Sequence, residues 1–222
     1  MKNNKNQIKS YLQRISNILL MNGCFLDNPG LYTGKMGLVL LFFRYARYTQ
    51  NELYSEYSFD LIEKVQNRIH QETLIDYKQG LAGIGSAIEY LEQNGYIEAN
   101  TDEILEDFDK RIFFTFNLPY LPVDDILSIG YYVHWRMSGN SAKKEFLQQN
   151  ILPPIEHLVR SRAITPAWHP LSRKEQVDHS ISNSFHISLK NNSINDVFEK
   201  YSHNLGIHNG LAGLGMTLFN RT

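Results

Sequence analysis

Gln79-Gly80-Leu81-Ala82-Gly83-Ile84-Gly85 recurs almost unchanged as Asn209-Gly210-Leu211-Ala212-Gly213-Leu214-Gly215. A looser copy, Thr33-Gly34-Lys35-Met36-Gly37-Leu38, keeps the Gly-x-x-Gly spacing. Apolar residues follow each copy, so we expect each copy to open a helix. Because glycine in a helix costs about 1 kcal/mol relative to alanine, its recurrence indicates that the backbone approaches a neighbour closely. The glycines that we predict to be structural are Gly34, Gly37, Gly80, Gly83, Gly85, Gly210, Gly213 and Gly215.

These glycines do not match the common phosphate-binding motifs. A P-loop requires a lysine after its last glycine, whereas Gly85 is followed by Ser86 and Ala87. The dinucleotide-binding motif requires a buried strand before its glycines, whereas residues 76–79 are polar. The pattern therefore favours a role in helix packing over nucleotide binding.

The composition is typical of one globular domain, which we place at 1–222. Apolar residues make up 42% of the 222 residues, enough for a sizeable core. The 22 basic and 23 acidic residues predict neither a nucleic-acid nor a membrane partner. The single cysteine, Cys24, allows no internal disulfide and no cysteine-pair zinc site, and it favours a cytoplasmic location. We expect its thiol to be buried or half-buried.

The N-terminal segment is apolar before Cys24, as in a lipoprotein signal, but polar residues interrupt it. Its apolar residues instead follow helical spacing, which predicts an amphipathic first helix. These residues are Ile8, Tyr11, Leu12, Ile15, Ile18 and Leu19.

The glycine phrases and a degenerate copy at Gly130 define a repeat. The intervals from Gly34 to Gly80 and from Gly80 to Gly130 are about 46 and 50 residues, the length of a helical hairpin with its loops. Asn100 and Glu103 have the spacing of a capping box. Apolar residues with a helical period predict further helices at 52–70, 100–116, 123–137, 141–162 and 194–201.

The last third of the chain is less regular. Pro153-Pro154 predicts a break within the helix at 141–162. Residues 163–190 show no clear period, which predicts a long loop. We expect Ser193 to cap the next helix and the final helix to run to Thr222. Strand signals are nearly absent, so the predicted fold is all-α, with helical hairpins repeated around an axis.

Residues 76–85 and 205–213 resemble the lanthionine synthetase cyclase family, the LanC-like proteins. The resemblance extends in pattern over most of the chain. It implies a partial α/α toroid of repeated helical hairpins, with four or five in place of the family's about six or seven. Family members close thioether rings in ribosomally made peptides by adding a cysteine thiolate to a dehydrated serine or threonine, with zinc lowering the thiol pKa.

The resemblance also implies roles for particular residues. Asp76 stands four positions before Gly80, where the family has a functional aspartate, which implies a catalytic role. Asn209 occupies the position of a family histidine and His208 precedes it, so we assign His208 to catalysis and Asn209 to substrate binding. The Trp-Cys and Cys-His-Gly motifs of the family's zinc ligands are absent, so we expect no metal and no cofactor.

Each of these residues also has a structural interpretation. An aspartate before a helix is typically a cap, so Asp76 has that alternative. Trp168 and His169 lie between prolines in a stiff segment that suits substrate binding or a packed corner. Asp124-Asp125 with tryptophans elsewhere is compatible with a glycoside hydrolase, although neighbouring carboxylates more simply start a helix.

The sequence thus predicts a LanC-like protein in the maturation of ribosomally made peptides. The first hypothesis is an accessory protein or pseudo-cyclase that binds a precursor peptide or a peptide-modifying enzyme. The alternative is a zinc-independent enzyme, including a glycoside hydrolase of the α/α toroid type. A purely structural interaction module is a third possibility. An incomplete ring would expose apolar helix faces, which predicts a homodimer.

Overall fold

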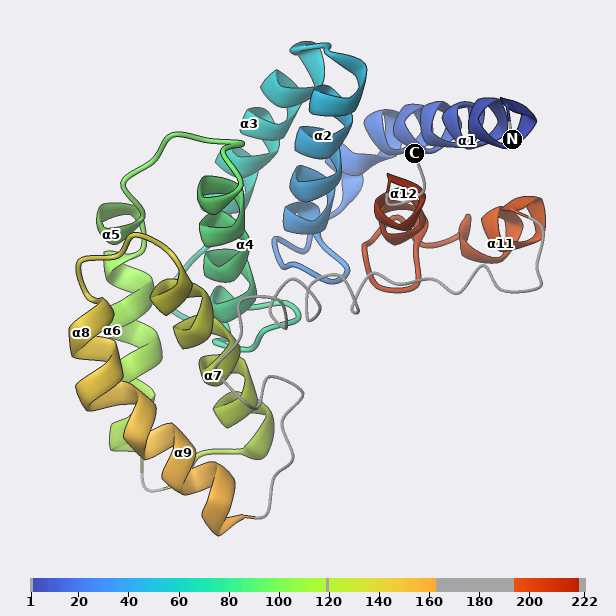
Figure 1. Cartoon of the computed structure of the whole chain (residues 1–222). Helices are drawn as coiled ribbons and strands as arrows, with labels where there is room; N and C mark the ends of the chain where they lie inside the picture. Colours follow the sequence, from blue (N-terminus) through green and yellow to red (C-terminus); the bar gives the residue numbers. More distant parts are fainter. Residues whose placement is uncertain (1, 119, 163–193, 220–222) are drawn as a thin grey trace. The chain divides into compact units, whose positions relative to one another are not determined.

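The computed structural model describes residues 2–118, 120–162 and 194–219, and these residues form helices and loops without strands (Figure 1). The predicted all-α fold class is confirmed. The helices fall into two compact units. Residues 2–70 and 194–219 belong to the first unit, and residues 71–162 belong to the second. One domain spanning 1–222 stays a prediction.

The first unit is built on a helical hairpin with the N-terminal helix and the last glycine-led helix beside it. The turn of the hairpin holds Gln50 in the left-handed conformation, with φ of 54°. The first helix buries Ile8, Leu12, Ile15 and Leu19, which confirms its amphipathic pattern. The elements are α1 (Lys2–Asn22), η1 (Gly23–Phe25), α2 (Lys35–Thr49), α3 (Leu53–Gln66), α11 (Ile194–Tyr201) and α12 (Leu211–Phe219).

The second unit is organised around a pair of packed helices, α4 and α7, with α6 against the first and α9 against the second. Both α4 and α7 are apolar for most of their length, because each is covered by neighbours on more than one side. The elements are α4 (Leu81–Gln93), α5 (Thr101–Ile104), α6 (Glu106–Phe114), η2 (Thr115–Asn117), α7 (Val123–Ser138), α8 (Lys144–Phe146), η3 (Leu147–Ile151) and α9 (Leu152–Ser161).

All three glycine phrases share one way of starting a helix. The first N–H groups of α2, α4 and α12 donate to carbonyls of the preceding loop. Leu81 N, for example, lies 2.8 Å from Leu74 O. The equivalent bonds, Lys35 N to Asn28 O and Leu211 N to Asn204 O, are 2.9 and 2.7 Å long. Backbone carbonyls thus cap the helices, and the loop must fold back onto the helix start.

That fold-back explains the first glycine of each phrase. A β-carbon at Gly80 would lie 2.2 Å from Leu74 O, and one at Gly34 would lie 2.4 Å from Asn28 O. We expected the close neighbour to be another helix, but at these positions it is the chain's own loop. A neighbouring helix is instead met by Gly85, where a β-carbon would lie 2.5 Å from Tyr132 Cε2.

Several local expectations were wrong. The helix predicted at 100–116 is broken at Leu105 into α5 and α6, and the Asn100 side chain makes no capping bond. The interruption predicted at Pro153-Pro154, by contrast, is present, because the α-helical pattern is broken by η3 and resumes at Leu152. The prolines stand in the first turn of α9, directly after the π-helical turn η3, where missing N–H groups are tolerated. Cys24 is exposed, because η1 places it outside the core.

Other boundaries agree more closely with the expectations. The helix predicted at 123–137 is α7, and the one at 194–201 is α11. The helix predicted at 52–70 ends at Gln66. The loop predicted at 163–190, the Ser193 cap and the end of the last helix lie outside the described residues. Within the described ranges, no helix is both long and apolar enough to cross a membrane.

Candidate functional site

The loop before α4 carries Asp76, the residue predicted to be catalytic. Its Oδ1 accepts hydrogen bonds from Lys78 N at 2.8 Å and Gln79 N at 2.9 Å. The carboxylate therefore holds the loop in front of Gly80, the N-cap residue of α4. Its Oδ2 is buried and has no hydrogen-bond partner among the described residues. One oxygen thus shapes the loop, while the other is a buried acceptor without a hydrogen bond, which is rare in folded proteins.

The other two copies show that the loop forms without a carboxylate at this place. The position four residues before the helix-opening glycine is Gly30 in the first copy and Gly206 in the last. In those loops the amide N–H of the glycine itself donates to a side-chain oxygen, from Asn28 at 2.7 Å and from Asn204 at 2.9 Å. Asp76 is therefore a departure from the repeat, and such departures concentrate at functional sites.

One face of α7 lies against this loop. Tyr77 N donates to Ser128 Oγ at 3.0 Å, and the rings of Tyr77 and Tyr131 are 4.8 Å apart. Asp125 shares that face, because residues at i, i+3 and i+6 lie on one side of a helix. Burial raises the pKa of Asp125, and the negative charges of Asp76 and Asp124 raise it further. The charges of Asp76 and Asp125 therefore interact, and we call these two residues the carboxyl pair; two interacting acids suit proton transfer or the binding of a cationic group.

His208 and Asn209 lie in the first unit, in the loop that precedes α12. The imidazole of His208 stacks on the ring of Tyr32, with centroids 5.1 Å apart, and its backbone N–H donates to Tyr32 O at 3.0 Å. Asn209 has a left-handed backbone, with φ of 50°, and its Nδ2 lies 3.3 Å from His208 Nε2. The two side chains therefore face one another. Trp168 and His169 lie outside the described residues.

The tryptophan platform considered for a glycoside hydrolase does not involve Trp135. That side chain is only 3% exposed, and its ring packs edge-on against Tyr90 with centroids 5.8 Å apart. A buried indole cannot stack on a sugar. Asp124 and Asp125 start α7, as the simpler interpretation predicted.

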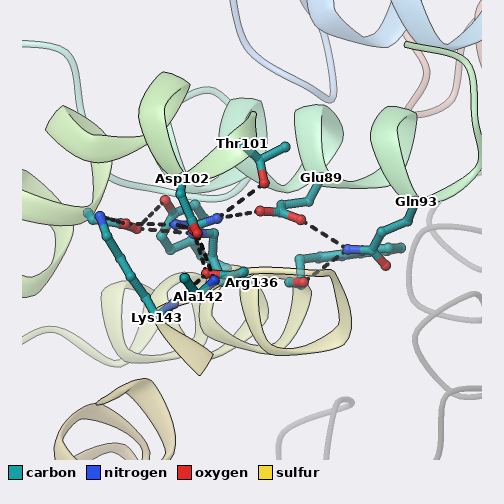
Figure 2. Close-up of polar contacts among 11 residues, drawn as sticks. Glu89, Gln93, Thr101, Asp102, Arg136, Ala142 and Lys143 are labelled. Carbon is teal, nitrogen blue, oxygen red and sulfur yellow. Dashed lines mark hydrogen bonds and ion pairs between the residues drawn. The ribbon is translucent and has the colours of Figure 1, made fainter. Parts of the chain in front are cut away.

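A buried polar cluster that the sequence analysis missed joins α4, α5, α6 and α7 (Figure 2). At its centre Arg136 is 0% exposed. The guanidinium donates to Glu89 Oε1 at 2.6 Å, to Asp102 Oδ1 at 2.7 Å and to Asp109 Oδ2 at 2.9 Å. Three carboxylates thus surround one arginine, and the side chain of Asp102 is the most exposed of them at 23%.

Further hydrogen bonds complete the cluster. Lys143 Nζ donates to Asp109 Oδ2 at 2.9 Å, and Tyr132 Oη donates to Asp109 Oδ1 at 2.6 Å. Asp102 also accepts from Ser141 Oγ at 2.6 Å and from Ala142 N at 2.7 Å, which ties the turn before α8 to α5 (Figure 2). The Asp102 carboxylate, in the first turn of α5, thus links α5 to α7 and to the turn before α8.

The ionisation of the cluster follows from these contacts. Burial acts to lower the pKa of Arg136, but hydrogen bonds to Asp109 and Glu89 outweigh it and raise the pKa above its usual value. Burial also acts to raise the pKa of Asp102, but bonds from Ser141, Ala142 and Arg136 lower it overall. Both groups stay charged at neutral pH. A satisfied buried network of this kind fixes helix positions, so we assign it to the framework.

The glycine-led hairpins define the class of protein as an all-α helical-repeat protein. The family model described as lanthionine synthetase C-like protein matches residues 26–148, more than half of the chain. The chain therefore belongs to that family, and its hairpins are consistent with the family's α/α toroid fold. No curated protein and no solved structure matches the chain.

The family's zinc chemistry can be tested against the residues of this chain. The resemblance implies two cysteines and a histidine as ligands, whereas the chain has a single cysteine, exposed in η1. The described residues also contain no group of three histidine, cysteine, aspartate or glutamate side chains placed to hold a metal ion. The residues of this chain therefore do not fit the family's zinc site.

Proposed function

We propose that the protein acts in the maturation of ribosomally synthesised peptides as an accessory protein or pseudo-cyclase. In this role it binds a precursor peptide or a peptide-modifying enzyme, in the cytoplasm. The family match supports the peptide-maturation setting. The single cysteine supports a binding role, because thiol activation of the family's type requires two cysteine ligands.

The observation that carries the proposal is the unpartnered Oδ2 of Asp76. This oxygen belongs to a carboxylate whose charge raises the pKa of Asp125, on a loop that the other two repeats build without a carboxylate. A cationic group of a peptide, such as a lysine ammonium or an N-terminal amine, would give this oxygen a partner and relieve the repulsion between the two acids. His208 and Asn209 offer a second polar group for binding, in the first unit.

A second function is favoured by the same carboxyl pair. Two carboxyl groups with different environments can act as a general acid and a general base without zinc. Asp76 and Asp125 would then catalyse addition to a dehydrated residue or, as in glycoside hydrolases, hydrolysis of a glycosidic bond. The homodimer also stays a prediction.

The two functions are separated by measuring binding and turnover on one substrate. The probe is a fluorescent peptide that contains one cysteine, one dehydroalanine and two lysines. Binding is followed by anisotropy, and ring closure by loss of the free thiol. The binding role predicts saturable binding without catalysed thiol loss, and weaker binding to the Asp76→Asn variant. Asp107→Asn, on the exposed surface of α6, is the matched control.

Catalysed thiol loss that disappears in Asp76→Asn while binding persists would favour the enzyme. Catalysed hydrolysis of an aryl glycoside that depends on Asp76 and Asp125 would favour the glycosidase. Absence of binding to the peptide would contradict the binding role.

A further inference from the structure

Lys35 occupies a place where the other two glycine phrases have a buried leucine. The residue after the first glycine is Leu81 in the second copy and Leu211 in the third, and both are 0% exposed. Lys35 is only 3% exposed. It also stands at the N-terminus of α2, where the helix dipole disfavours a cation. Neither the repeat nor the helix therefore explains a lysine at this position.

The ammonium of Lys35 lacks a partner within the described part of the chain, since no hydrogen bond or ion pair joins it to a described residue. With only 3% of the residue exposed, a charge without a partner is costly at this position. Burial accordingly lowers the pKa of Lys35, against the opposing charge of Asp27. An incoming carboxylate would stabilise this group.

The charges around Lys35 are unbalanced. Lys64 and Arg68, from the end of α3 and just beyond it, repel its ammonium, and Asp27 alone attracts it as a carboxylate. Asp27 is already paired with Arg68, with Oδ1 and Nη2 3.1 Å apart. The nearer carboxylates of α3, Glu63 and Asp60, are not among the charges that act most strongly on Lys35, and Asp60 acts on Tyr57. Three cations thus face one carboxylate.

Two exposed apolar side chains lie within three residues of Cys24, which itself acts electrostatically on Lys35. Met21 at the end of α1 is 74% exposed, and Phe25 in η1 is 77% exposed. The η1 turn packs on α2, since a β-carbon at Gly23 would lie 2.6 Å from Leu38 Cδ2. Leu38 is three residues after Lys35, on the same side of α2. We name Met21, Cys24, Phe25, Lys35, Lys64 and Arg68 the Lys35 patch.

We propose that the Lys35 patch docks an acidic peptide segment in which an apolar side chain lies next to the carboxylate that reaches Lys35. The inference rests on the proposed function. It specifies the chemistry of the peptide segment that binds at the Lys35 patch, apart from the loop that carries Asp76. Charge complementarity selects the acid, and Met21 with Phe25 selects the apolar neighbour. A membrane surface would be met by the exposed Lys64 and Arg68 but not by Lys35, whose side chain is buried.

The test uses Cys24, which is the only cysteine in the chain and is exposed within the patch. An environment-sensitive fluorophore on Cys24 reports where a ligand binds, and anisotropy with unlabelled protein gives the affinity. The probe is a synthetic peptide of alternating glutamate and leucine. Its matched control has lysine in place of glutamate. We expect saturable binding of the acidic peptide with a fluorophore response, and no binding of the basic one.

Lys35→Leu is the decisive variant, because it restores the residue of the other two copies and is expected to fold with equal or greater stability. It should weaken binding of the acidic peptide about tenfold or more. Lys9→Leu, on the exposed side of α1, should leave the affinity unchanged. Equal affinity of Lys35→Leu and the original protein would overturn the inference, as would absence of saturable binding.

Two other results would also overturn it by naming a different occupant. A fluorophore response to anionic lipid vesicles without one to the peptide would indicate a membrane. A response that depends on protein concentration alone would indicate a second copy of the chain. If the cysteine and dehydroalanine peptide binds Lys35→Leu normally, the proposed function stands while this inference fails. If that peptide does not bind the original protein, the proposed function fails whatever the patch does.

Discussion

Arg136 Nη1 lies 2.6 Å from Glu89 Oε1, and both side chains are 0% exposed. This ion pair joins α7 to α4, the two helices whose N-terminal ends carry the Asp125 and Asp76 segments. Removing one partner of a buried ion pair leaves the other without a counter-charge, which is more costly than losing the pair as a whole.

Arg136→Met should therefore destabilise the protein strongly. The variant leaves Glu89 and Asp109 buried without the guanidinium, so we expect a loss of about 3–5 kcal/mol in the free energy of unfolding. Urea denaturation followed by circular dichroism measures it. Lys110→Met is the control, because Lys110 and Glu106 form an exposed pair at 2.9 Å, and exposed ion pairs contribute little to stability. Equal losses in the two variants would contradict the framework role of the cluster.

Gly80→Ala should also be destabilising, although the backbone angles suit alanine, with φ of −110° and ψ of −166°. The reason is steric, because the new β-carbon would lie 2.2 Å from Leu74 O, a backbone atom. We expect a loss of about 2 kcal/mol or more and a displaced Asp76 loop. Thermal denaturation measures the loss.

Gly95→Ala provides the contrast. Gly95 has a left-handed φ of 63° and nothing within 4 Å of an added β-carbon. Its substitution should cost about 1 kcal/mol, from backbone conformation alone. If Gly80→Ala were as mild, the carbonyl-capped start of α4 would not require glycine.

His134 should make the stability depend on pH. Its side chain is 8% exposed, its Nε2 is buried without a partner among the described residues, and burial lowers its pKa to about 4. The unfolded chain takes up the proton near pH 6.5, so between pH 6.5 and 4 it binds more protons than the folded protein. Stability should be full above this window and fall as the pH decreases through it.

The expected slope is up to about 1.4 kcal/mol per pH unit, measured by urea denaturation at a series of pH values. His134→Phe should remove this slope, whereas His157→Phe, on the exposed side of α9, should keep it. Asp102 affects stability in a separate pH range. Its pKa is lowered from 3.8 in the folded protein, so its stabilising charge is lost as the pH falls below the range in which His134 acts. A slope that survives in His134→Phe would contradict the assignment.

Periodicity and glycine spacing predicted most of the helices, because amphipathic patterns such as that of α1 are local. The Arg136 cluster could not be predicted in the same way. Its members come from four helices, and a charged residue within an apolar helix, such as Glu89 or Arg136, signals a buried partner without identifying it. The capping box predicted from Asn100 and Glu103 was wrong because the Asn100 side chain makes no capping bond at the start of the short helix α5. Asp76 was predicted as a site residue from its position before Gly80. The electrostatic interaction between Asp76 and Asp125 could be recognised only once the structure had brought α7 against that loop.

We propose that this family member binds peptides without the family's zinc-activated thiol chemistry, and its zinc content is the most direct test of that proposal. The measurement is elemental mass spectrometry of the protein purified without chelator and dialysed against metal-free buffer. We expect zinc far below one ion per chain, and unchanged thermal stability after treatment with a chelator. One zinc ion per chain, lost together with stability on chelation, would contradict it.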